Sequence, residues 1–126
     1  MSFNPFSDQV GLEFIPANPG ESLCKLRLTE AHFNPHKVVH GGVLFTMADT
    51  GMGSALYPTL PDGQICATIE IKINYFRPVL EGEVTCHSRI VNRGRSIANI
   101  ESEIQAGGKL VAKANGSFAI YTPPTA

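Results

Sequence analysis

Apolar and polar positions along the chain divide it into one apolar helix and a series of alternating strands. Apolar and small residues from about Gly41 to Leu56 predict a long helix, which the stretch from Pro58 to Gly63 ends. The residues from Val10 to Ala17 predict a short first strand, followed by a turn signal at 18–20. Alternation with a period of two is typical of half-buried strands, and it occupies Glu21–Thr29, Ile65–Arg77, Glu83–Asn92, Ser96–Ala106 and Lys109–Tyr121.

The order of these elements favours an α+β architecture. A helix that is apolar on nearly every side must be covered on most of them, and a strongly curved antiparallel β-sheet can wrap around one central helix. We therefore expect a single domain over residues 1–126, with two strands before the helix and four strands in a meander after it. Close approach of helix and sheet backbones is expected at the glycines of the helix: Gly41, Gly42, Gly51 and Gly53.

Composition and charge narrow the range of partners. The chain has 126 residues and a net charge of -1, which gives no general attraction to nucleic acid or to an anionic membrane. Residues 1–6 lack the features of a signal peptide, and the longest uncharged run contains too many polar and breaking residues for a membrane span. The odd number of cysteines, without CxxC spacing, predicts buried free thiols in a reducing cytoplasm: Cys24, Cys66 and Cys86.

Asp49 is the first candidate for chemistry, because it is the only charged residue between Val38 and Pro61. A carboxylate in an apolar helix is costly to bury, so such a group usually has a partner or a task. A structural carboxylate paired with a lysine is the alternative. As a catalytic group, Asp49 can act as a general base toward water, or it can attack a carbonyl carbon itself.

A longer motif surrounds this residue. It consists of Asn34, the triplet His40-Gly41-Gly42, and Asp49 nine residues after His40; the strand 68–78 also ends in a Tyr-x-x-Pro pattern. Over about residues 21–121 the chain resembles the hotdog-fold acyl-CoA thioesterases of the PaaI-like, phenylacetic-acid-degradation type. The resemblance implies a hotdog fold and hydrolysis of acyl-CoA thioesters, with no cofactor beyond the coenzyme A of the substrate. It also implies a homodimer, pairing into a homotetramer, with active sites between subunits.

The resemblance also suggests roles for four further residues. Gly41 begins the helix, where its N–H would point outward at the positive end of the helix dipole, and its missing side chain admits a carbonyl oxygen closely. The family places the thioester or the water with groups at the positions of Asn34 and His40. A hydroxyl at the position of Thr68 orients the attacking group. The structural alternatives are a turn for Asn34, a helix cap for His40 and ordinary strand propensity for Thr68.

The phosphates of coenzyme A need cations, and the densest basic spot is a turn that contains two arginines. A solvated hairpin turn is the alternative for these arginines. The expected residues for binding the substrate and coenzyme A are Gly42, Arg77, Arg93, Gly94, Arg95 and Ser96. An acyl pocket is expected near Phe45, Met47, Met52, Leu56 or Tyr57, where it would suit a small aromatic or medium-chain acyl group; a pocket that accepts many acyl groups is the alternative.

Two other functions stay open. Hotdog dehydratases and hydratases also act on acyl thioesters, but here Thr46 and Met47 stand where the dehydratase acid is expected. His32 and Lys37 replace the acid and the histidine of the hydratase motif. A non-catalytic acyl-CoA-binding module is the other alternative, although a binder needs no carboxylate such as Asp49 beside the carbonyl.

A metal site is not expected. His32, His36 and His40 are spaced four apart, which on a helix would align them as ligands. Pro35 argues against a helix through this segment, and no acidic or cysteine ligands accompany the histidines.

Overall fold

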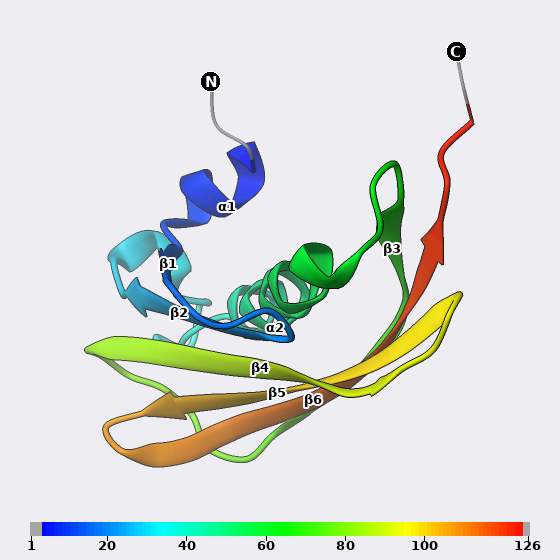
Figure 1. Cartoon of the computed structure of the whole chain (residues 1–126). Helices are drawn as coiled ribbons and strands as arrows, with labels where there is room; N and C mark the ends of the chain where they lie inside the picture. The colour runs from blue at the N-terminus through cyan, green and yellow to red at the C-terminus, as the bar shows by residue number, and fades with distance from the viewer. Residues whose placement is uncertain (1–3, 125–126) are drawn as a thin grey trace.

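A computed structural model describes residues 4–124 and shows a curved antiparallel sheet of six strands with a long helix in its concavity (Figure 1). The sequence-based expectation of an α+β fold with a sheet wrapped around one helix is confirmed. The helices are α1 (Pro5–Val10) and α2 (Gly41–Leu56), with short 3-10 turns η1 (Glu30–His32) and η2 (Tyr57–Thr59). The strands are β1 (Glu13–Ile15), β2 (Glu21–Arg27), β3 (Ile65–Tyr75), β4 (Glu83–Arg93), β5 (Ile97–Ala106) and β6 (Lys109–Tyr121).

The order of strands in the sheet is β1-β2-β4-β5-β6-β3, so the predicted meander of four strands is wrong. β4, β5 and β6 do follow one another, but β3 pairs with β6, and β4 pairs with β2 instead. Alternation along a strand predicts the face that each side chain takes, but not the neighbouring strand, because pairing depends on distant parts of the chain. As a result, β3 lies at an edge of the sheet.

The N-terminal segment also differs from the predicted strand Val10–Ala17. β1 covers only Glu13–Ile15, and the helix α1 precedes it. Asn4 caps this helix, because its side-chain oxygen accepts a hydrogen bond of 3.1 Å from the Ser7 amide. A helix of six residues is less than two turns long, too short for a clear helical periodicity in the sequence.

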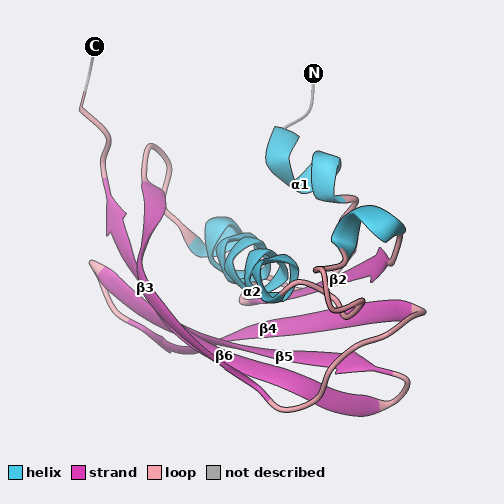
Figure 2. Cartoon of the chain, turned by 180° about the vertical axis from the view of Figure 1, so that it is seen from behind, coloured by secondary structure: helices cyan, strands magenta, loops and turns pink. Residues whose placement is uncertain are grey.

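The core lies between α2 and the concave face of the sheet (Figure 2). Helix and sheet approach closely at Gly51, as expected: its carbonyl accepts a 2.5 Å hydrogen bond from Ser22 Oγ, and a Cβ there would lie 2.6 Å from Ser88 Oγ. The same expectation is wrong for Gly53, where an added Cβ would meet no atom within 4 Å. The buried stripe of α2 consists of Leu44, Met47, Ala48, Gly51, Met52, Ala55 and Leu56.

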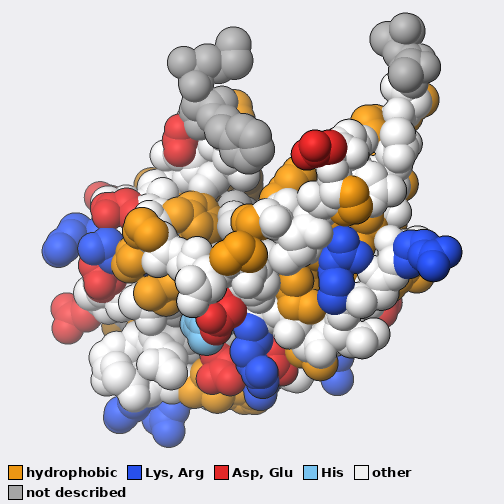
Figure 3. Space-filling model, in the orientation of Figure 1, with side chains coloured by type: hydrophobic (Ala, Val, Ile, Leu, Met, Phe, Trp, Pro, Cys, Tyr) orange, Lys and Arg blue, Asp and Glu red, His pale blue; other side chains and the backbone are white. Residues whose placement is uncertain are grey.

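The opposite side of α2 is not covered by the sheet. Gly42 and Phe45 are exposed and Asp49 is half-buried, so the expectation of a helix covered on most sides is wrong for a single chain. Strand β3 is also exposed along most of its length, including the side chains of Ile69 and Tyr75. Hydrophobic side chains reach the surface on the face seen in Figure 3. The open side of the helix and the edge strand together therefore present a partly apolar surface that includes Asp49.

The three thiols are free, and Cys24 and Cys86 are buried as expected, whereas Cys66 is only half-buried. Within residues 4–124, no helix combines the length and the apolar character that a bilayer span requires. Nor does this described part of the chain bring three His, Cys, Asp or Glu side chains together in a group that could hold a metal ion.

Candidate active site

The carboxylate of Asp49 is held by a hydroxyl group from the edge strand. Thr68 lies on the inward face of β3, opposite Phe118, and its Oγ1 donates a hydrogen bond of 2.7 Å to Asp49 Oδ1. None of the ion pairs within residues 4–124 involves Asp49, so the alternative of a lysine-paired carboxylate finds no partner there. The single hydroxyl contact orients the carboxylate and leaves its second oxygen available for a proton or for a carbonyl carbon.

A cavity of about 210 Å³ adjoins this pair. Cys66, two positions before Thr68 on the same face of β3, also lines it, and the period-two pattern of the strand could have predicted this neighbour. Burial, together with the nearby negative charge of Asp49, raises the pKa of the Cys66 thiol, so this group stays protonated and uncharged at neutral pH. The other lining residues are Asn4, Thr50, Gly53, Ser54, Tyr57, Ala67 and Phe118.

Of the residues expected from the sequence to lie near an acyl pocket, only Tyr57 lines the cavity beside Asp49. Met47, Met52 and Leu56 do not line it, because they belong to the buried stripe of α2 and are fully inaccessible within the core. The helical pattern alone could not show which apolar side of α2 faces the sheet, because nearly every side of this helix is apolar.

The histidine of the motif forms the N-terminal cap of α2. His40 Nδ1 accepts a hydrogen bond of 2.8 Å from the Gly42 amide, and the His40 carbonyl accepts one of 2.9 Å from the Val43 amide. The alternative of a helix cap is therefore correct, because Nδ1 of the His40 ring caps α2. Because Nδ1 acts as an acceptor, the neutral ring carries its proton on Nε2, which is available as a donor. Capping and a contact with substrate are thus compatible for His40.

Gly41 provides a backbone N–H at the start of the helix. Among the described residues 4–124, no acceptor is hydrogen-bonded to this N–H, although the neighbouring amides of Gly42 and Val43 are both bonded to His40. The carbonyl of Gly41 accepts a 2.8 Å hydrogen bond from the hydroxyl of Tyr75, at the end of β3. The N–H of Gly41 is therefore a donor at the positive end of the helix dipole, suited to an oxyanion.

Asn34 shapes the loop before the helix, as its structural alternative predicted. Its Oδ1 accepts hydrogen bonds from the amides of His36, at 2.8 Å, and Val38, at 3.4 Å. This turn includes Lys37 with a positive φ of 64°. The carboxamide nitrogen of Asn34 makes no hydrogen bond with the part of the chain that the structure describes, so the side chain retains two donor hydrogens.

The structure does not bring the two halves of the predicted site together within one chain. Asp49 follows Gly41 by eight residues on the same helix. With a rise of 1.5 Å per residue, the two positions are about 12 Å apart along the helix axis. One thioester carbonyl cannot touch both groups across this distance. A single chain therefore carries an Asp49–Thr68 half and, at the other end of the helix, a half with Gly41, His40 and Asn34.

The arginine turn predicted to bind phosphate is largely engaged in internal contacts. Arg93 donates from Nε to Thr59 Oγ1 at 3.2 Å and from Nη2 to the Thr59 carbonyl at 3.3 Å, and its Nη1 bonds to the Gly94 carbonyl. The Gly94 amide donates to the carbonyl of Ile97 at 2.9 Å. Arg93 thus fastens the end of β4 to η2, a contact with a residue 34 positions away that the sequence could not predict. Arg95 is exposed.

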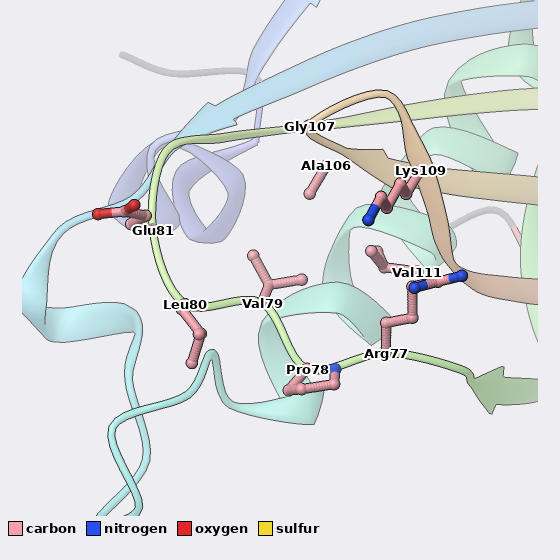
Figure 4. Close-up of a pocket in the computed structure, with 9 residues that line it drawn as sticks. All are labelled: Arg77, Pro78, Val79, Leu80, Glu81, Ala106, Gly107, Lys109 and Val111. Atoms are coloured by element: carbon pink, nitrogen blue, oxygen red, sulfur yellow. The ribbon is translucent and has the colours of Figure 1, made fainter.

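Arg77 lies beside the Gly41 half of the site. It lines a pocket of about 290 Å³ together with Gly41 and Tyr75, and also an adjoining pocket of about 580 Å³. Figure 4 shows Arg77 and Lys109 on the same side of the larger pocket, with Glu81 at the far side. Lys109 was not singled out from the sequence, because its place in the pocket depends on the β5–β6 hairpin reaching the loop after β3.

Comparisons with known proteins agree with this architecture. The sequence matches the thioesterase superfamily over residues 36–113. The fold is similar to that of a conserved protein, PA5202, from Pseudomonas aeruginosa, with 35% identity, a TM-score of 0.86 and coverage of 94% of this chain and 95% of that chain. A mutant of the phenylacetic acid degradation protein PaaI from Thermus thermophilus is 29% identical, with a TM-score of 0.86 over 92% of this chain and 98% of that chain. Acyl-coenzyme A thioesterase 13 from Homo sapiens is 28% identical over 107 residues, which cover 81% of this chain and 74% of the human protein.

The curved sheet around one helix, together with these matches, identifies a hotdog-fold enzyme that acts on thioesters. The chain belongs to the thioesterase superfamily, and its similarity to the PaaI protein places it with the hotdog-fold thioesterases of the PaaI type. It is a thioester hydrolase. The dehydratase, hydratase and non-catalytic binding alternatives are not supported by any of these matches.

Proposed function

We propose that the protein hydrolyses acyl-CoA thioesters at sites shared between two copies of the chain. Asp49 and Thr68 of one copy would face Gly41, His40 and Asn34 of the other. The observation that carries this proposal is the separation of about 12 Å between the oriented carboxylate and the free N–H within one helix. A second copy of the chain would supply the missing half of each site.

The edge strand supports this assembly. β3 ends the sheet and carries Thr68, and its exposed side chains include Ile69, which is 54% accessible. An exposed edge strand with apolar side chains is a template for pairing with another chain. Two copies joined through β3 would bury these side chains and extend the sheet. Pairing of such dimers into a homotetramer is the further expectation from the family.

The chemistry follows from the groups in the two halves. Asp49 takes a proton from water, whose oxygen attacks the thioester carbon, or its own oxygen attacks and forms a mixed anhydride that water then hydrolyses. In both cases the C–S bond breaks and the coenzyme A sulfur leaves, taking up a proton. The N–H of Gly41 and the Nε2–H of His40 would donate to the carbonyl oxygen as negative charge develops on it. No further cofactor is needed.

The acyl group would occupy the cavity of about 210 Å³ beside Asp49, where Tyr57 and Phe118 provide apolar surface. This volume suits a small aromatic or a medium-chain acyl group. The PaaI protein is a phenylacetic acid degradation protein and the human relative is an acyl-coenzyme A thioesterase, which favours the same substrate class. The free thiols fit the cytoplasmic location expected from the sequence.

The experiment that tests the proposed function is release of free thiol from a panel of aromatic, short-chain and long-chain acyl-CoAs. Hydrolysis of any member supports the substrate class, and the fastest member identifies the acyl group. Absence of hydrolysis across the whole panel would refute the proposal that acyl-CoA is the substrate.

The shared site makes a separate prediction for mixtures of two inactive variants. Asp49→Ala and Gly41→Pro each remove one half, so a mixed dimer has one site with both defects and one intact site. After subunit exchange of an equal mixture, activity should return to about a quarter of wild type. Half of the dimers are then mixed, and in each mixed dimer one of the two sites is intact. A mixture that exchanges subunits, as followed by mass spectrometry of the intact dimers, but stays inactive would show that each site lies within one chain.

We propose that the coenzyme A phosphates lie near Arg77, because this guanidinium lines both pockets next to Gly41, whereas Arg93 is engaged with Thr59. Arg77→Ala should raise KM for the best acyl-CoA by about tenfold and change kcat little, since one charge-assisted contact to phosphate is lost. KM for the same acyl group on pantetheine, which carries no phosphate, should not change. Arg27→Ala, at an exposed arginine of β2, is the control. An equal rise in KM for both substrates would contradict a phosphate contact.

A further inference from the structure

We propose that Tyr75 is a positioning residue for the hydrolysis, because its hydroxyl holds the Gly41-Gly42 turn so that the Gly41 N–H points toward the thioester oxygen. The inference rests on the proposed function, in which that N–H is the oxyanion donor. It adds a residue at the end of β3 that touches neither the substrate carbonyl nor the attacking group, and that acts through the backbone of the helix.

The first turn of α2 needs outside support to keep one geometry. Two consecutive glycines begin the helix, and glycine loses more backbone freedom on folding than any other residue. Three side chains hold the polar groups of this turn. His40 Nδ1 accepts from the Gly42 amide at 2.8 Å, Thr46 Oγ1 donates to the Gly42 carbonyl at 2.8 Å, and the Tyr75 hydroxyl donates to the Gly41 carbonyl at 2.8 Å.

These three contacts leave the N–H of Gly41 without a partner among the described residues. His40 and Thr46 belong to the same local segment as the turn, and they fix Gly42. Tyr75 is the contact that comes from the sheet, 34 residues away in the sequence, and it fixes Gly41. The Gly41 N–H is then the one backbone donor of this turn that has no acceptor in the described part of the chain. Tyr75 therefore ties the orientation of that donor to strand β3.

The tyrosine ring also limits the space beside Gly41. A Cβ added to Gly41 would lie 3.2 Å from both Cζ and the hydroxyl oxygen of Tyr75, so the ring packs directly over the glycine. Burial raises the pKa of Tyr75 above its usual value. The phenol thus stays protonated across the neutral range and remains a hydrogen-bond donor to the carbonyl.

The test is Tyr75→Phe, which keeps the ring and removes only the hydroxyl. Tyr121→Phe, at an exposed tyrosine at the end of β6, is the matched control. We expect Tyr75→Phe to lower kcat for the best acyl-CoA by about tenfold with KM within about twofold, because one oriented hydrogen bond acts on the transition state. Tyr121→Phe should match wild type. Thermal unfolding and size-exclusion chromatography establish that each variant is folded and assembled.

A second comparison separates positioning from general support. In the Gly41→Pro background, where the N–H is gone, Tyr75→Phe should cause no further loss of kcat, since the group it orients is absent. An equal loss in both backgrounds would overturn the inference, and so would a rise in KM with unchanged kcat or no effect on kcat. If wild type hydrolyses no acyl-CoA, the proposed function fails first; if wild type is active and Tyr75→Phe is not impaired, only this inference fails.

Discussion

Replacement of Asp49 by asparagine is expected to lower kcat for acyl-CoA hydrolysis by at least about 10²-fold, the lower range for removal of a general base. Asparagine has the same shape, and its Oδ1 can still accept the 2.7 Å hydrogen bond from Thr68, so the geometry of the site should be kept. The amide can neither take a proton from water nor attack the thioester carbon. Release of free thiol measures the rate, and isothermal titration with the acyl-CoA measures whether binding is retained.

Asp62→Asn is the control for this prediction, because Asp62 is an exposed carboxylate in the loop before β3. It changes the net charge by the same amount without touching the site and should behave as wild type. If the Asp49→Asn protein kept its turnover while binding substrate normally, the carboxylate would have no catalytic role, and the Asp49–Thr68 pair would be a structural contact.

The parts of this molecule that could be predicted from the sequence are those that local pattern decides. The helix Gly41–Leu56 has the predicted ends, because the His40 cap and Pro58 mark them chemically. The Asp49–Thr68 pair was also expected, and the structure joins its two members by a hydrogen bond. The resemblance to the thioesterases singled out Thr68, because a threonine in a strand is otherwise an ordinary strand former.

The parts that could not be predicted depend on distant contacts. The pairing of β3 with β6 is decided by the whole sheet, so the alternation within β3 could not reveal it. Arg93 looked available for phosphate until its contacts with Thr59 were known. Tyr75 reads as an ordinary inward residue of a strand, and its contact with the Gly41 carbonyl appears only when the strand end lies against the helix start.

Replacement of Gly41 by proline should lower kcat by about 10²–10³-fold, the cost of removing one oxyanion donor. Proline lacks the N–H that the mechanism requires, yet it is favoured at the first position of a helix, where its fixed φ is already suitable. His40 has φ -63° and ψ 132°, the extended conformation that a residue before proline prefers. The helix should therefore still form, and free-thiol release under saturating acyl-CoA should show a defect in turnover.

Gly41→Ala is the matched control, because it separates loss of the N–H from crowding. Both substitutions add a Cβ at 3.2 Å from the Tyr75 ring, but only alanine keeps the backbone donor. We expect the alanine variant to lose much less of kcat than the proline variant, while circular dichroism and thermal unfolding verify that both are folded. Equal losses in the two variants would mean that the space over Gly41, and not its N–H, is what turnover requires, and the oxyanion role would then have to pass to His40 Nε2 or to the amide of Asn34.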